Sequence, residues 1–106
     1  MPNDWNYASN TIEVIGGGGG GRTRGSGAAG GGGGAYAKKG NITTLTPGST
    51  IYIQVGTGNT AELSGTATWF NDTTATTSDC GDQSVCATGG LTGAGANDNT
   101  GGLGGA

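Results

Sequence analysis

The stretch Thr11-Ile-Glu-Val-Ile15 runs directly into six consecutive glycines, Gly16 to Gly21. A second glycine block, Gly30 to Gly34, leads into Ala35-Tyr-Ala-Lys-Lys39, which also has a strand-like sequence. A disordered linker would not be framed by strands in this way. Because glycine has no Cβ, such runs let backbones approach closely. We therefore expect both blocks to be ordered, extended and packed against backbone, with Arg22 to Ala29 as the exposed tip between them.

Every glycine of the two blocks is a candidate packing or assembly residue. These are Gly16, Gly17, Gly18, Gly19, Gly20, Gly21, Gly30, Gly31, Gly32, Gly33 and Gly34. A side chain at Gly18 or at Gly32 is expected to hold neighbouring chains apart, whereas a change at Ser26 should be tolerated.

The composition describes a small domain with little material for an apolar core. The chain has 106 residues, of which 27 are glycine and only 31% are hydrophobic. Disordered chains usually combine low hydrophobicity with high net charge, but the net charge here is only −3. Small domains with weak cores often need oligomerisation. We therefore expect the isolated chain to be marginally stable and other copies to stabilise it.

One β-hairpin is predicted around a Pro-Gly turn. Ile42 to Leu45 and Ile51 to Val55 flank Thr46-Pro-Gly-Ser49, whose centre is typical of a type II turn. Alternation along the second strand predicts that Ile51, Ile53 and Val55 face the core.

The predicted fold is all-β, a small antiparallel β-sandwich-like domain with long glycine-rich segments of polyglycine II type and no helix. Short β-branched or aromatic runs at 66–70 and 85–88 add further strands. Residues 1–90 form the glycine-rich β domain. The Gly/Ala/Asn-rich segment 91–106 either continues this domain or follows it.

Two cysteines, Cys80 and Cys86, flank the polar loop Gly-Asp-Gln-Ser-Val. They are interpreted either as a disulfide, in an oxidising compartment, or as two reduced thiols. No metal site is expected, because the chain has no histidine and no second cysteine pair. No cofactor is expected either, since the glycine blocks lack the Gly-Lys-Ser/Thr of a phosphate loop and any βαβ unit.

A few side chains are candidates for surface contacts. Adjacent strand residues face opposite ways, so Trp69 and Phe70 are interpreted either as core or, for one of them, as a sugar-stacking surface. Arg22 and Arg24 are interpreted as solvated charges or as anion contacts. Asn41 and Asn71 each begin an Asn-x-Thr sequon, which would permit glycosylation outside the cell.

Several function classes are disfavoured by what the chain contains. Four basic residues make no stripe for nucleic acid. No stretch approaches the roughly 20 apolar residues of a membrane span, so no membrane insertion is expected. With no histidine and scattered carboxylates, no acid–base or nucleophile constellation is recognisable, and we expect the protein not to be an enzyme.

A succession of motifs covers nearly the whole chain: Pro2-x-Asp4-Trp5, Asn10 to Gly21, Gly30 to Lys38, Thr46-Pro-Gly-Ser49, Ile53-x-Val55-Gly56, Thr68-Trp-Phe-Asn71 and Val85-x-Ala87-x-Gly89-Gly90. In this order they resemble the glycine-rich domain common in phage tail proteins and related prophage-encoded proteins. The resemblance implies a virion protein of tail fibres or tail tips, without catalysis, whose glycine segments pack as polyglycine layers. Members of that family usually have a strand before the Pro-x-Asp-Trp element and rarely carry the cysteine pair.

Three hypotheses follow. The first is a structural or adhesive component of a phage particle, located in the virion tail or outside the cell, whose partners are its own copies, other virion proteins and host-surface glycans. The second is a subunit of an extracellular filament, in which copies share open strand edges. The third is an ice-binding protein, which the lack of a regular Gly-x-x repeat disfavours.

Overall fold

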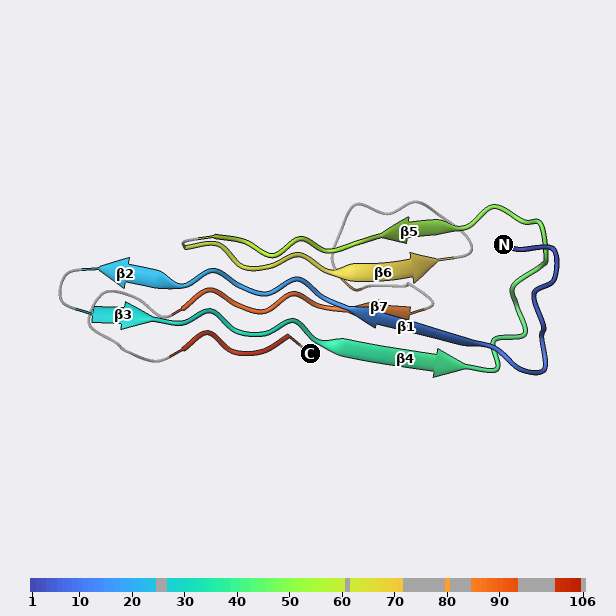
Figure 1. Ribbon diagram of the computed structural model, residues 1–106, viewed down its shortest axis with the longest axis horizontal. Helices are drawn as coiled ribbons and strands as arrows, with labels where there is room; N and C mark the ends of the chain where they lie inside the picture. Colours follow the sequence, from blue (N-terminus) through green and yellow to red (C-terminus); the bar gives the residue numbers. More distant parts are fainter. Residues whose placement is uncertain (25–26, 61, 72–79, 81–84, 94–100, 106) are drawn as a thin grey trace.

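The computed structural model describes residues 1–24, 27–60, 62–71, 80, 85–93 and 101–105. In this part of the chain all regular structure is strand, arranged in three small antiparallel sheets, and no helix is present. The molecule is elongated, with dimensions of 56 × 22 × 18 Å. Two of the sheets lie at one end, and extended glycine-rich segments run from them to the other end (Figure 1). The predicted all-β fold without a helix is confirmed.

The strands in chain order are β1 (Thr11–Ile15), β2 (Arg22–Arg24), β3 (Gly27–Ala29), β4 (Tyr36–Gly40), β5 (Tyr52–Gln54), β6 (Thr68–Asn71) and β7 (Val85–Ala87). β1 pairs with β4, and β2 pairs with β3. The third sheet has the order β5-β6-β7. All pairs are antiparallel, and the glycine-rich segments next to β1, β4, β5, β6 and β7 continue in line with these strands (Figure 1).

The hydrophobic core lies between the β1–β4 sheet and strands β6 and β7, which pack against it. Its buried members are Val14, Ala35, Ile42, Leu45, Phe70, Val85 and Ala87. In β1, Ile12 and Val14 point toward this core, so Glu13 and Ile15 point outward by the two-residue period of a strand. The core is short, and it does not extend along the glycine-rich half.

The predicted hairpin over Ile42–Leu45 and Ile51–Val55 is wrong. Residues 42–45 form no strand, and β5 pairs with β6 instead. Ile42 and Leu45 are nevertheless buried, because the side chain of Asn10 holds this segment in place of a strand partner. The Ile42 N–H donates to Asn10 Oδ1 at 2.7 Å, and Asn10 Nδ2 donates to the Ile42 carbonyl at 3.0 Å.

The turn itself is confirmed, but the predicted core face of Ile51, Ile53 and Val55 is correct only for Ile51, which packs against the core. Gly48 has φ of +75°, and the Ser49 N–H donates to the Thr46 carbonyl at 3.1 Å, as in a type II turn. Ile53 and Val55, however, are 64% and 75% exposed. β5 is an edge strand, and among the strands only β6 packs against it. At Ile53 and Val55 the face that the alternation assigns to the core therefore stays exposed.

Six glycine-rich segments fill the other half of the described molecule. We number them I (16–21), II (30–34), III (56–60), IV (63–67), V (88–93) and VI (101–105). They are joined sideways by backbone hydrogen bonds and lie in two rows of three, with III, I and II in row one and IV, V and VI in row two. Residues 91–93 and 102–105 are therefore part of the same hydrogen-bonded bundle as the two glycine blocks.

The hydrogen bonds recur every third residue. From segment I to segment IV, Gly17 donates to Thr66 and Gly20 to Leu63; from segment V to segment I, Gly90 donates to Gly17 and Gly93 to Gly20, at 2.8–3.1 Å. A repeat of three residues per turn is the period of the polyproline II conformation, which has no internal hydrogen bonds. The N–H and C=O groups of each segment can therefore form hydrogen bonds with neighbouring segments in several directions.

The same period decides which glycines could carry a side chain. A Cβ at Gly32 would overlap the carbonyl oxygen of Leu103, whereas a Cβ at Gly33 would have nothing within 4 Å. Glycines whose Cβ would overlap backbone are Gly16, Gly17, Gly19, Gly20, Gly31, Gly32, Gly34, Gly56, Gly65, Gly89, Gly90, Gly93, Gly102 and Gly105. Those with open space or ordinary contact only are Gly18, Gly30, Gly33, Gly58, Gly101 and Gly104. Within one chain Gly18 and Gly32 therefore differ, because only Gly18 has room for a Cβ.

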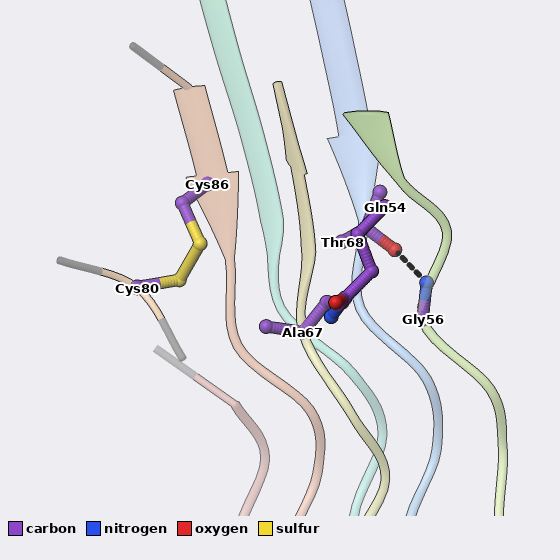
Figure 2. Close-up of a disulfide and its surroundings, with 6 residues drawn as sticks. All are labelled: Gln54, Gly56, Ala67, Thr68, Cys80 and Cys86. Atoms are coloured by element: carbon purple, nitrogen blue, oxygen red, sulfur yellow. Dashed lines mark hydrogen bonds between the residues drawn. A yellow bond between two sulfur atoms is a disulfide. The ribbon is translucent and has the colours of Figure 1, made fainter. Parts of the chain in front are cut away.

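Threonine hydroxyls join the strands to the glycine segments. The Gly56 N–H donates to Thr68 Oγ1 and the Thr57 N–H to Thr66 Oγ1, both at 2.8 Å. Figure 2 shows the first of these bonds where the chain leaves β5. At this point the interval between successive hydrogen bonds to a neighbouring segment changes from the two residues of a sheet to the three residues of the bundle. The hydroxyls supply acceptors where the backbone registers no longer match.

Candidate functional site

An exposed apolar belt crosses the outer side of row one, where the strands become glycine segments. Ile15 at the end of β1 is the register partner of Tyr36 at the start of β4, and both side chains are more than half exposed. The belt therefore takes one large apolar side chain from β1, which leads into segment I, and one from β4, which follows segment II.

Bare backbone continues this surface toward the other end of the molecule. Gly18 and Gly33 are outward positions of segments I and II. Their N–H groups have no hydrogen-bond partner among the described residues. We call the belt together with these outward glycines the row-one face.

A cross-strand ion pair lies at the other border of the belt. Lys38 Nζ is 3.2 Å from Glu13 Oε1, and both side chains are about half exposed. The two residues are register partners on β4 and β1. The charges therefore cancel on this part of the face.

The opposite face, formed by row two, carries leucines. Leu63, Leu91 and Leu103 come from segments IV, V and VI, and all three are exposed. A groove of about 500 Å³ lies over segment V, lined among others by Ser64, Leu91 and Gly104. Sequence reasoning missed this face. The signal was the repeated Gly-Gly-Leu at 89–91 and 101–103, whose leucine is exposed in both copies.

The end of the bundle far from the two-layered core carries the β2–β3 pair (Figure 1). Arg22 of β2 lies 3.9 Å from Glu62 through its Nε atom, at the long limit for an ion pair. The side chain of Arg24 and the residue Ser26 lie outside the described part of the chain.

The proposed surface role of Trp69 or Phe70 is wrong. Both residues are buried, at 4% and 8% exposure. Alternation does place them on opposite sides of β6, and Phe70 lies in the core cluster. Trp69 is nevertheless covered, between the register partners Gln54 on β5 and Cys86 on β7. A central strand covered on both faces was not anticipated from a chain with so few large side chains.

The two sequons differ in accessibility. Asn41 is exposed and has φ of 53°, in the left-handed region that asparagine tolerates better than most residues. Asn71 is only 3% exposed on β6. A glycan on Asn71 would have to displace its neighbours in the folded chain, so that candidate is withdrawn and Asn41 is kept.

Cys80 and Cys86 form a disulfide, with their Cα atoms 5.6 Å apart (Figure 2). Cys86 lies on β7, and the bond ties residue 80 to the edge of the three-stranded sheet. It is thus a local staple beside the strands that enter the bundle.

Neither metal ligands nor a membrane-spanning helix was found in the described ranges. In those ranges no group of three or more His, Cys, Asp or Glu side chains converges, and no helix is long and apolar enough to cross a bilayer.

Comparison with known proteins places this arrangement in a family. The model of the family described as glycine-rich domain matches residues 3–106, and the chain belongs to that family. No curated protein and no solved structure matches the chain.

Proposed function

We propose that this member of the glycine-rich domain family is a structural and adhesive component of a phage particle, in the tail fibre or tail tip. It acts through assembly and surface binding, without catalysis. The order of motifs along the chain, which resembles the glycine-rich domain of phage tail proteins, supports this biological setting. Its partners are copies of itself, other virion proteins and glycans on the host surface.

The observation that carries this proposal is a shaft that extends away from the core. Six segments crosslinked by backbone hydrogen bonds form the shaft, and the β2–β3 pair lies at its far end (Figure 1). Loops on a rigid scaffold can vary in sequence without loss of the fold, and binding residues are disproportionately found on such loops. An adhesin at the tip of a tail needs such a scaffold to present its binding surface.

The proposal is tested by locating the protein. Phage particles are purified from a culture that produces it and are labelled with a gold-conjugated antibody against the chain. Gold on the tails, especially at their tips, is the expected result. Particles without gold, from a culture whose soluble fraction contains the protein, would contradict the assignment to a virion.

A filament subunit is the second candidate, and β5 is the observation that favours it. This strand is the edge of its sheet, and Ile53 on it is exposed. An exposed apolar edge strand is a template for pairing with another chain. Negative-stain microscopy of the purified protein separates the two candidates, since long fibres of pure protein are expected only for the filament.

A further inference from the structure

We propose that a second copy of this chain packs on the row-one face, with segments I and II of one copy over segments II and I of the other. This inference rests on the assembly part of the proposed function and names the surface that performs it. The carrying observation is the exposed pair Ile15 and Tyr36 on the outer side of the β1–β4 sheet, which none of the described residues covers.

The register of β1 and β4 makes this face complementary to itself. A two-fold axis parallel to the strands and midway between β1 and β4 places β1 of one copy over β4 of the other at the same height. Because Ile15 and Tyr36 are register partners, each Ile15 then meets the Tyr36 of the other copy. Such an isologous contact is closed and gives a dimer, the commonest symmetric assembly.

The charged residues and the glycine backbone of the face are also complementary under this two-fold axis. Glu13 and Lys38 are also register partners, so the axis places each carboxylate over the ammonium group of the other copy. Farther along the bundle, Gly18 of segment I comes over segment II near Gly33, because the Gly19 N–H donates to Gly32 at 2.8 Å and fixes that register. Neither glycine has a Cβ to hold the two backbones apart. Apolar, charged and bare positions of the face thus match at three successive heights.

The available area is sufficient. The broad side of the molecule, 56 × 22 Å, has an area of about 1,200 Å². Segments I and II with β1 and β4 are two of the three lines of chain in the row, so their overlap covers at most about 800 Å² on each copy, the size of a standard stable interface. On the row-two face, by contrast, exposed Leu91 lines an open groove.

The test measures the mass of the purified chain by sedimentation velocity over a wide range of concentrations. The wild type is expected to shift from monomer to dimer as concentration rises. Ile15→Lys should weaken the dimer about tenfold or more, since it buries a charge at the centre of the contact. Leu103→Lys is the matched control, because Leu103 is similarly exposed, at 72% against 65%, but lies on the opposite row. This control should dimerise like the wild type.

A second pair of variants tests the glycine part of the contact. Gly33→Val and Gly104→Val both introduce a side chain where the monomer has room, on opposite rows. Only the first should weaken the dimer, and circular dichroism should show that both fold. A wild type that stays monomeric at all concentrations overturns the inference, as does a dimer lost through Leu103→Lys and kept by Ile15→Lys. A dimer that behaves as expected, with no gold on the phage particles, would overturn the assignment to a tail and leave the interface standing.

Discussion

Neighbouring glycines in this bundle have opposite surroundings, although the sequence presents them as identical. Gly32 lies against the backbone of segment VI, and Gly33 points to open space. The difference arises from the three-residue period, which turns two positions of each triplet toward other segments and leaves the third outward. Substitution at adjacent residues should therefore have very different effects on the monomer.

We predict that Gly32→Val lowers the free energy of unfolding by at least about 3 kcal/mol, or prevents folding, because a side chain there must displace backbone. Gly33→Val should stay within about 0.5 kcal/mol of the wild type in dilute solution. Urea unfolding followed by circular dichroism measures both. Equal losses would show that the inward and outward assignments are incorrect.

Asn10 is a second position where one side chain determines local structure. Its amide pairs with both the N–H and the carbonyl of Ile42, in a segment that has no strand partner. We predict that Asn10→Ala costs about 1–3 kcal/mol, because the N–H of buried Ile42 loses its acceptor.

The matched control for Asn10→Ala is Asn6→Ala. Asn6 also accepts a backbone N–H through Oδ1, from Ala8, but it does so at the exposed surface. Chemical denaturation should show a change of no more than about 0.5 kcal/mol for this control. If Asn6→Ala lowered the free energy of unfolding as much as Asn10→Ala does, burial of the hydrogen bond would not explain the effect of Asn10→Ala.

At the scale of elements, strands framed by glycine could be predicted, but their pairing could not. The runs that become β1, β4, β6 and β7 are short and β-branched or aromatic, and turn residues bound them, so local sequence was enough. The prediction of a hairpin was wrong because Asn10, 32 residues away from Ile42, supplies the hydrogen-bond partner that residues 42–45 would otherwise find in β5. Nothing local distinguishes a strand from an extended segment held by a distant side chain.

The candidate surfaces were harder to predict for the same reason. Which of Ile53, Trp69 or Phe70 is exposed depends on how many strands lie in the opposite layer. A two-residue alternation identifies two faces and cannot say which is covered. The exposure of Ile53 on β5 and the burial of Trp69 depend on how the assembled sheets cover one another.

The disulfide beside β7 should stabilise the sheets by a moderate amount. It closes a short loop, with a sequence separation of 6, for which the loop-entropy relation gives about 2 kcal/mol. Reduction with a phosphine should lower the melting temperature of the wild type while leaving the fold all-β. The double variant Cys80→Ser with Cys86→Ser should melt like the reduced wild type and should not respond to the phosphine. A phosphine response in the double variant would point to an effect unrelated to this bond.

On the scale of the whole molecule, two kinds of packing are joined end to end. The short apolar core fixes the orientation of the strands, and backbone hydrogen bonds carry that orientation along the bundle. Ordering glycine costs more conformational entropy than ordering any other residue. Its hydrogen bonds each contribute only about 1 kcal/mol net. The glycine half should therefore be stable only while its segments remain packed together.

This balance leads to a prediction about concentration. The core contains few large side chains, and Ile15 and Tyr36 gain burial only in the proposed dimer. Because association stabilises the folded state by mass action, the melting temperature of the wild type should rise with protein concentration, whereas that of Ile15→Lys should stay low and constant. Scanning calorimetry over a range of concentrations measures both. A dilute monomer that melts cooperatively above about 60 °C, near the upper end for ordinary mesophilic domains, would show that the bundle is stable without a partner, and that glycine packing within one chain outweighs its entropic cost.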